Sequence, residues 1–289
     1  MNIREEYNMF VANEMALTDI YYPVLEADDT VTSVDDDSNK MNFGQKLLQK
    51  VNKLIKELLA IIERTFDRIW QFLKRVAQTD VGFKDTIRKA IRDRKPLEAV
   101  KLIAYQYNEG FLNTQMTKVT KEVFDLITNL KTSYADIENG AQSPMDLPTK
   151  ELYQYIFSKI GCKKDIFSMD QYYLFLKHGY RVEKKEMLFK GSETRNYYNI
   201  ALSRDELENV INAKKQVMKS QTAVIKTQLS TITMNRTTQN DVKKRAMKQY
   251  SNASHLYNFY SSFLNIYTQL QIEKMMSYRA VLKKLYHIA

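Results

Sequence analysis

Residues 43–76 decide the fold and read FGQKLLQKVNKLIKELLAIIERTFDRIWQFLKRV. Their apolar side chains recur at steps of three and four from Leu47 to Val76, which is the spacing of one face of an α-helix. The remaining positions carry eight lysines and arginines against three acidic residues. Because an α-helix turns once every ~3.6 residues, this period predicts one amphipathic helix of about nine turns.

A second long helical pattern fills the last third of the chain. Ser203 and Glu206 have the spacing of a capping box, which predicts a helix from there to about Met234. Three rows in this run recur every seven residues: Val210, Val217, Val224 and Thr231; Ile211, Met218, Ile225 and Ile232; and the small residues Ala213, Ser220 and Thr227. A heptad repeat with a seam of small residues favours close packing against a second helix, as in a coiled coil.

The partner helix is predicted from about Asp241 to Tyr286. Its heptad rows are rich in tyrosine: Tyr250, Tyr257, Leu264, Tyr278 and Leu285 on one, and Ala253, Tyr260, Tyr267 and Val281 on the next. The linker 235–240 is short, so the two helices should be antiparallel. At ~1.5 Å per residue the last helix would be about 70 Å long. It exceeds its partner, so its far end needs another surface, either the 43–76 helix or another subunit.

Shorter elements are predicted between these two patterns. Helices are expected over 83–93, from Pro96 to about Tyr107, and over 112–137, 150–160 and 168–178. Proline suits the first helical position, and Ser168 with Gln171 has capping-box spacing. Residues 139–148 read as a loop. Residues 180–202 are expected to form a β-hairpin, with Gly191-Ser192 as the turn between strands 180–189 and 194–202.

These patterns predict a mainly all-α fold. The expected architecture is an elongated helical bundle with a long C-terminal antiparallel helical hairpin and a small β-hairpin near 180–202. Only seven glycines and four prolines occur in 289 residues, which favours helix throughout. Four regions are predicted: an acidic N-terminal segment and linker over 1–40, a helical region over 41–138, a small mixed subdomain over 149–202, and the helical hairpin over 203–289.

Charge divides the chain into an acidic head and a basic body. Residues 1–40 carry a net charge of −8 within a chain of +10, which leaves +18 on residues 41–289. The longest apolar run, 58–62, is far shorter than the ~20 residues of a membrane span. No basic region precedes an apolar core at the N-terminus, so secretion by a signal peptide is not expected. The single cysteine, Cys162, rules out an intrachain disulfide.

No residue pattern predicts catalysis, a metal or a cofactor. The three histidines, His178, His255 and His287, are far apart and lack metal-ligand spacing. Cys162 has two following lysines that could lower the pKa of its thiol, yet no local base to orient it. Glycine-rich phosphate loops are absent from the sequence. We therefore expect a protein that is not an enzyme and holds no cofactor.

Two basic clusters are candidates for binding a polyanion. Lys84, Arg88, Arg92 and Lys95 share one helical face, and Arg236, Lys243, Lys244, Arg245 and Lys248 gather near the tip of the predicted hairpin. Clusters of this kind suit phosphate contacts, which supply affinity without sequence information. Solvated helix ends explain them equally well. The cationic amphipathic helix 43–76, with Trp70, could instead lie on a membrane surface, although a core position is preferred.

Residues 23–29, PVLEADD, carry a family resemblance. The Val24-Leu25-Glu26-Ala27 segment resembles the maturation sites of tailed-bacteriophage head proteins. In that family a prohead protease cuts after a glutamate that has an aliphatic residue two positions earlier. The resemblance implies cleavage between Glu26 and Ala27, with loss of an acidic propeptide. Loss of residues 1–26 would raise the net charge from +10 to +14.

Together these observations predict a non-enzymatic structural or assembly protein. The resemblance implies an internal or minor virion component of a tailed bacteriophage, located in the virion or the host cytoplasm. Its expected partners are other copies or other virion proteins, with non-specific DNA contact and no small-molecule substrate. The alternatives are a membrane-surface-binding protein that uses helix 43–76, and a sequence-nonspecific nucleic-acid-binding protein.

Overall fold

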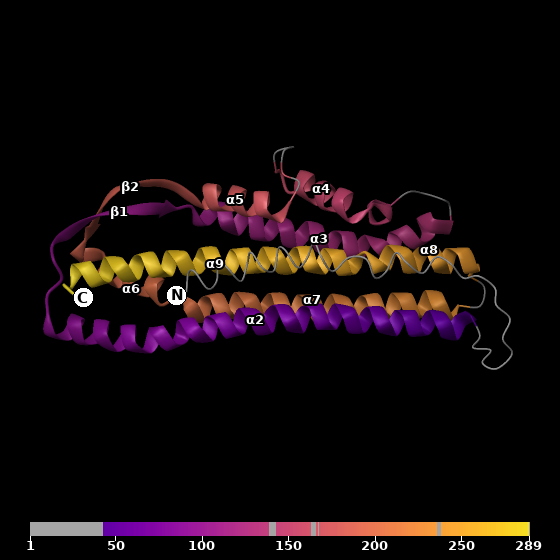
Figure 1. The fold of residues 1–289 in the computed structure, drawn as a ribbon, viewed down its shortest axis with the longest axis horizontal. Coiled ribbons are helices and arrows are strands. Elements are labelled where there is room, and N and C mark those ends of the chain that lie inside the picture. The colour runs from indigo at the N-terminus through magenta and orange to yellow at the C-terminus, as the bar shows by residue number, and fades with distance from the viewer. Residues whose placement is uncertain (1–42, 139–142, 163–165, 167, 236–237, 289) are drawn as a thin grey trace.

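The computed structural model describes residues 43–138, 143–162, 166, 168–235 and 238–288. The predicted cleavage site at Glu26 and Ala27, the acidic segment 1–40 and the basic residue Arg236 lie outside these residues. Four helical rows run along the long axis of the molecule, with a two-stranded ribbon at the end where the chain terminates (Figure 1).

The predicted first helix is present and is longer than expected. Helix α2 spans Phe43–Asp93 without interruption, 51 residues in all. It therefore includes the separate helix expected over 83–93, and the predicted end near Val76 is wrong. The helix continues because Ile87 and Ala90 extend its buried face into a second core. Gly82 does not break it, since a single helical glycine costs only about 1 kcal/mol relative to alanine.

The C-terminal hairpin is confirmed as antiparallel. Helix α7 spans Arg204–Met234 and runs toward the end of the bundle at which α2 begins (Figure 1). The chain returns through α8, Asn240–Ser251, and α9, Ala253–Leu285. The expected single return helix is thus two helices divided at Asn252. The far end of α9 packs against α2 and α6, which supplies the additional surface that its length required.

The packing seam of α7 is only partly as predicted. Ile211, Met218, Ile225 and Ile232 are buried, whereas the small residues Ala213, Ser220 and Thr227 are exposed and form no seam. Large side chains therefore fill the interface, and the helices do not need close backbone contact. The expected capping box at Ser203 is also absent, because its hydroxyl donates to the Ile200 carbonyl at 2.9 Å.

Three further helices cover α8 and α9. Helix α3 spans Glu109–Glu138, close to the predicted 112–137. Helix α4, Thr149–Lys159, and helix α5, Met169–Tyr180, match the two short helices expected there. The predicted capping box at Ser168 is confirmed, since Gln171 N–H donates to the Ser168 hydroxyl at 3.3 Å. The part of the 139–148 loop that is described contains a 3₁₀ turn, Pro144–Asp146.

A small antiparallel sheet is present, but one of its strands is not where we expected it. Strand β2 spans Arg181–Lys190 and pairs with β1, Ala99–Tyr107. The helix predicted from Pro96 is therefore wrong. The sequence AVKLIAYQY alternates between two faces and is rich in β-formers, and β2 supplies its hydrogen-bonding partner. We call this pair of strands the ribbon.

The second predicted strand of the 180–202 hairpin is a helix. Helix α6 spans Thr194–Ala201 and follows a 3₁₀ turn at Gly191–Glu193. It buries Tyr197 and Ala201 against the end of α9. Gly191 is required where the ribbon ends, because a Cβ atom there would collide with the Leu97 carbonyl oxygen. Its N–H donates to the Glu98 carbonyl at 2.8 Å.

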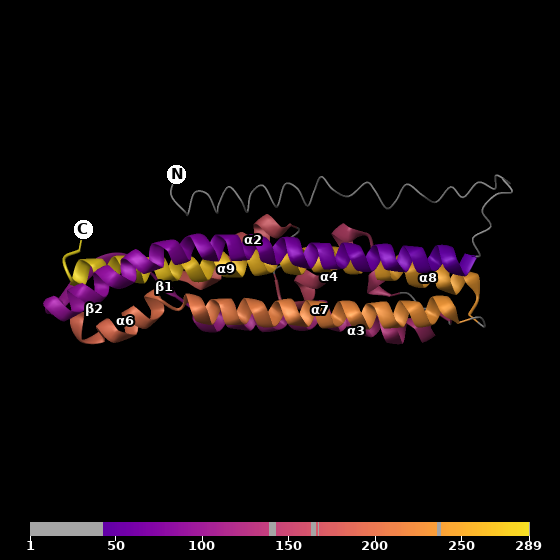
Figure 2. The same ribbon diagram turned by 90° about the horizontal axis from the view of Figure 1, so that it is seen from below.

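The interior is divided between a large core and a small one. The large core joins side chains of α2, α3, α4, α5, α7, α8 and α9. The small one lies at the ribbon end and includes Ile87, Phe189, Tyr197 and Leu282. In the view from below, α2 overlies α9 while α7 overlies α3, so the four rows form two layers (Figure 2). The predicted fold class, a mainly all-α elongated bundle with a small β element, is confirmed.

Candidate functional site

A groove opens at the ribbon end of the bundle. It is lined by the C-terminal halves of α2 and α9, by the ribbon, and by Ile288 near the chain end. Its volume is about 840 Å³, within the range of natural ligand sites. Helix α2 supplies Phe72, Thr79, Phe83 and Thr86; the ribbon supplies Ile103, Tyr105, Tyr107, Arg181 and Lys184; α9 supplies Ile272, Glu273, Met276, Arg279 and Lys283. We call this the ribbon groove.

The ribbon presents an aromatic ring between two cations. The Arg181 guanidinium lies over the Tyr105 ring at 4.9 Å from its centroid, and the Lys184 ammonium lies over the same ring at 5.7 Å. Lys184 pairs with Tyr105 across the two strands, which places their side chains on one face. The negative face of the ring therefore holds both cations at the groove wall.

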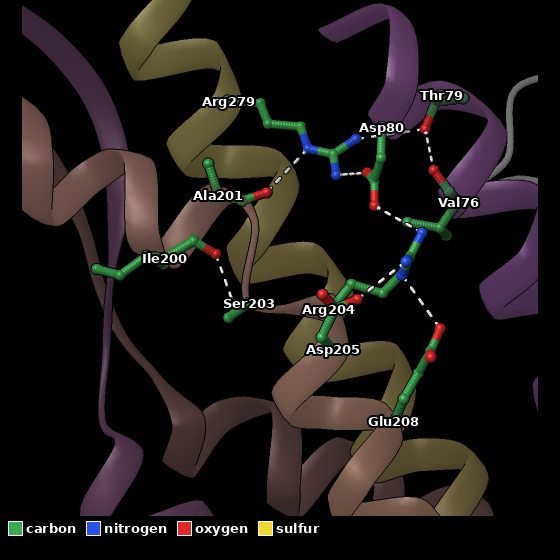
Figure 3. A network of polar contacts seen from close by, with 10 residues as sticks. All are labelled: Val76, Thr79, Asp80, Ile200, Ala201, Ser203, Arg204, Asp205, Glu208 and Arg279. Carbon is green, nitrogen blue, oxygen red and sulfur yellow. Dashed lines mark hydrogen bonds and ion pairs between the residues drawn. The ribbon is translucent and has the colours of Figure 1, made fainter. Parts of the chain in front are cut away.

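The floor of the ribbon groove is fixed by an ion-pair network (Figure 3). Arg279 of α9 pairs with Asp80 of α2, and its side chain is only 7% exposed. Its Nε donates to the Ala201 carbonyl oxygen at 3.1 Å and its Nη1 donates to Thr79 Oγ1 at 3.3 Å. Arg204, at the start of α7, reaches the second oxygen of Asp80 at 3.3 Å. Asp80 thus ties three helices together.

Burial lowers the pKa of Arg279 in this network without removing its charge. Desolvation lowers the pKa of Arg279 to about 10, which still leaves the guanidinium charged at neutral pH. The charge is also stabilised by the Phe83 ring, whose centroid lies 5.2 Å from the Arg279 guanidinium carbon. A buried arginine that stays charged needs its carboxylate partner, so Asp80 and Arg279 form a structural unit.

A second buried ion pair closes the side of the groove. Arg181 at the start of β2 pairs with Glu273 of α9, and their side chains are 7% and 10% exposed. The Nε atom of Arg181 is buried with no hydrogen-bond partner among the described residues. The charge of Arg181 at the groove wall is therefore paired, and its Nε atom is not exposed to the groove.

The lining of the ribbon groove combines charged side chains with apolar ones. Four cationic residues and one carboxylate line it, together with aromatic and aliphatic side chains. Its lining includes neither histidine nor cysteine. Within the described residues, no cluster of side chains could hold a metal ion. The arrangement favours an elongated anionic ligand with apolar parts.

The first predicted basic cluster remains together. Lys84, Arg88, Arg92 and Lys95 are all exposed on and just beyond the last turns of α2, beside the ribbon groove. Arg92 pairs with its exposed neighbour Asp93 at 2.8 Å. Four cationic side chains therefore face solvent at one end of the molecule.

The second predicted cluster is largely used in structural contacts. Lys243 is buried at 7% exposure, and Arg245 pairs with Asp146 at 3.5 Å. Lys244 lies 4.0 Å from Asp241, and Lys248 is exposed. Arg236 lies outside the described residues. The structure thus brings fewer free cations together at the hairpin tip than the sequence suggested.

The other titratable candidates are not part of the ribbon groove. His255 contacts Thr149 Oγ1, and burial lowers the pKa of its imidazole to about 4. Burial raises the pKa of the Cys162 thiol to about 12, opposite to the lowering that its neighbouring lysines suggested. His178 and His287 lie on separate elements.

The apolar face of helix 43–76 is occupied by protein. Leu58, Ile62, Phe66 and Leu73 are fully buried, so membrane binding through this face would require α2 to leave the bundle. Among the described residues, each helix is either too short or too polar to cross a bilayer.

Sequence reasoning missed the ribbon groove because four segments that are distant in the sequence, α2, β1, β2 and α9, build it. One signal was present: Asp80 and Arg279 interrupt apolar helix faces, between Val76 and Phe83 and between Met275 and Leu282. Charges in such positions are buried only when paired.

Comparison of the chain with protein-family models, curated proteins and solved structures finds no significant match.

Proposed function

We propose that this chain is a non-enzymatic structural or assembly protein, and that it acts as an internal or minor virion component of a tailed bacteriophage. The observation that carries the proposal is the placement of charge. Buried ionisable side chains such as Asp80 and Arg279 pair with each other, whereas the cluster from Lys84 to Lys95 faces solvent. The body thus offers an exposed cationic end on a stiff bundle, and this supports contact with DNA or acidic partners.

The virion part of the proposal is supported by the Glu26-Ala27 segment and by the acidic head. It is tested by mass spectrometry of purified particles from the phage that encodes the chain. We expect the mature chain to begin at Ala27, and we expect Glu26→Gln to retain the head. Glu14→Gln is the matched control and should be processed normally. A mature chain that starts at Met1, or particles without this chain, would contradict the proposal.

The DNA part of the proposal is tested by the salt dependence of binding to a duplex of mixed sequence. Lysine and arginine contacts to phosphate release counterions, so each lost contact reduces the slope of log K against log salt by about 0.9. We expect a smaller slope when Lys84, Arg88, Arg92 and Lys95 are all changed to Gln. The control changes Lys46, Lys50, Lys53 and Lys56, which are exposed at the other end of α2, to Gln. Equal losses in both variants would exclude a dedicated site.

A further inference from the structure

We propose that the ribbon groove is the docking site for the acidic N-terminal segment of the same chain, residues 2–17 above all. The inference goes beyond the proposed function, because docking requires neither a protease nor a virion. It depends on the charge of the groove, its exposed apolar side chains, and the length of chain that precedes α2.

Charge complementarity is the first argument. Four cations line the groove. Arg181 pairs with Glu273 and Arg279 pairs with Asp80, so the excess positive charge of the lining comes from Lys184 and Lys283. The exposed cations of α2 from Lys84 to Lys95 extend the positive surface beyond it. Residues 1–26 carry five acidic side chains and one arginine, and the following residues 27–40 are also acidic. A segment with this charge is attracted to this end of the molecule.

Apolar complementarity is the second argument. Apolar side chains in the groove are exposed to water, and Ile103 on the ribbon is 71% exposed. The rings of Phe83 and Tyr105 line the same space. In the N-terminal segment, Ile3, Tyr7, Phe10, Val11, Met15 and Leu17 fall near one helical stripe. An amphipathic segment that places this stripe in a groove removes apolar surface of both from water.

Chain length is the third argument. Helix α2 begins at Phe43, at the opposite end of the bundle from the groove (Figure 1). At ~1.5 Å per residue, Thr79 lies about 54 Å further along the helix. Residues 18–42 can span about 80 Å when extended at ~3.3 Å per residue. The segment 2–17 can therefore reach the groove, and the acidic charge of the connecting residues favours their extension.

The N-terminal segment is favoured over other anionic occupants because it is covalently attached. Attachment keeps it at a high effective concentration near the body, whereas a free amphiphile or a second copy must be recruited from solution. The proposal therefore commits to an intrachain contact, and contact between chains is an outcome that would overturn it.

The test is cysteine cross-linking in the full chain. Cys162→Ser removes the native thiol, and Ala12→Cys is combined with Thr86→Cys in the groove. The control pair combines Ala12→Cys with Thr227→Cys. Both threonines are exposed on helices and donate to a carbonyl four residues earlier, Thr86 to Gly82 at 2.7 Å and Thr227 to Ala223 at 3.1 Å. Thr227 lies near the end of α7, on the side where α2 begins (Figure 1).

This control separates docking from simple tethering. An undocked head would meet Thr227 more often, because that position is nearer to Phe43. We expect a short bis-maleimide to give at least about fivefold more monomeric cross-link at Thr86→Cys than at Thr227→Cys, because docking raises the local concentration. Equal cross-linking, a preference for position 227, or covalent dimers through position 86 would each overturn the proposal.

A charge-reversal pair tests the cause of the contact. Lys184→Glu changes an exposed side chain at the groove wall, and Lys226→Glu changes an exposed lysine on α7. The cross-link at position 86 should fall severalfold with Lys184→Glu and at about 0.5 M salt, where screening is strong, and should persist with Lys226→Glu. Circular dichroism confirms that each variant is folded. If the yield of cross-link at position 86 changed neither with Lys184→Glu nor with salt, a groove contact guided by charge would be excluded.

Discussion

Between Tyr257 and Tyr267, α9 is enclosed by aromatic and aliphatic side chains, whereas near Arg279 the same helix is held by buried ion pairs. In the middle of the bundle, the ring of Phe259 packs against Phe157, with centroids 5.4 Å apart. At the ribbon end, Asp80 connects Arg279 with Arg204. Apolar contacts in the middle are non-directional, whereas ion pairs at the ribbon end join individual atoms. The end that lines a groove is the end with fixed geometry.

Titratable groups follow the same division. In the middle, burial raises the pKa of Tyr257 and Tyr260 and lowers that of His255, so each neutral form is favoured. At the ribbon end, Arg279 remains charged despite its burial because a carboxylate lies against it. The middle of α9 thus favours neutral side chains, whereas its ribbon end holds a paired charge.

The largest expected effect is the loss of an aromatic ring from the middle. Phe259→Ala should lower the free energy of unfolding by about 3–5 kcal/mol, because it leaves a cavity among rings that are fully buried. Urea denaturation measures the loss. Leu174→Ala is the control, since Leu174 is 49% exposed, and it should change stability by less than about 0.5 kcal/mol. Similar losses of unfolding free energy in both variants would contradict close packing of the rings around Phe259.

A smaller but still large effect is expected from the ribbon end. Asp80→Asn should cost about 3 kcal/mol, because the charge of Arg279 would stay buried without its partner. Urea denaturation again provides the measurement. Asp93→Asn removes the exposed partner of Arg92 and should leave the unfolding midpoint unchanged. If Asp80→Asn also left the unfolding midpoint unchanged, the ion-pair network would not stabilise the floor of the groove.

The smallest expected effect depends on pH and concerns His255. Its pKa is about 4 in the folded chain and ~6.5 when unfolded, so the unfolded state takes up the proton first. Stability is therefore fully present above about pH 6.5 and is lost as the pH falls toward 4. Between pH 7.5 and 5 the loss should be about 2 kcal/mol.

Urea denaturation at several pH values checks this expectation. His255→Gln should remove that part of the acid loss, while carboxylates such as Glu63, whose pKa is lowered by hydrogen bonds from Lys215 and Lys219, still contribute to it. His178→Gln is the control and should keep the full acid loss. If the two variants lost the same stability at each pH, the interpretation that burial keeps His255 neutral would be contradicted.

Periodicity predicted the long elements because one face of each is continuously apolar. The rows through Leu58 and Ile211 could be read without knowledge of any partner. Strand β2 was also predicted, but its partner β1 was not, because Ala99–Tyr107 becomes a strand only when Arg181–Lys190 lies beside it. The tertiary partner then outweighs the local signal of Pro96 for a helix start.

The groove was less accessible to sequence reasoning than the fold. Its floor depends on Asp80 and Arg279, which are 199 positions apart. The basic cluster beside it was predicted, because Lys84 to Lys95 share a face within a single helix. Local patterns thus identified the charged surface, while the groove next to it required the packing of four segments, α2, β1, β2 and α9.

The ribbon also sets an order of assembly. Its strands enclose residues 108–180, and closing a flexible loop of that length costs about 4 kcal/mol in chain entropy. Helices within the loop shorten it once they form, so we expect the strands to pair after α3 and α5 have folded onto α9. On this expectation, the ribbon groove forms late in folding. A chain in which the ribbon groove has formed would then already have folded α3 and α5 onto α9.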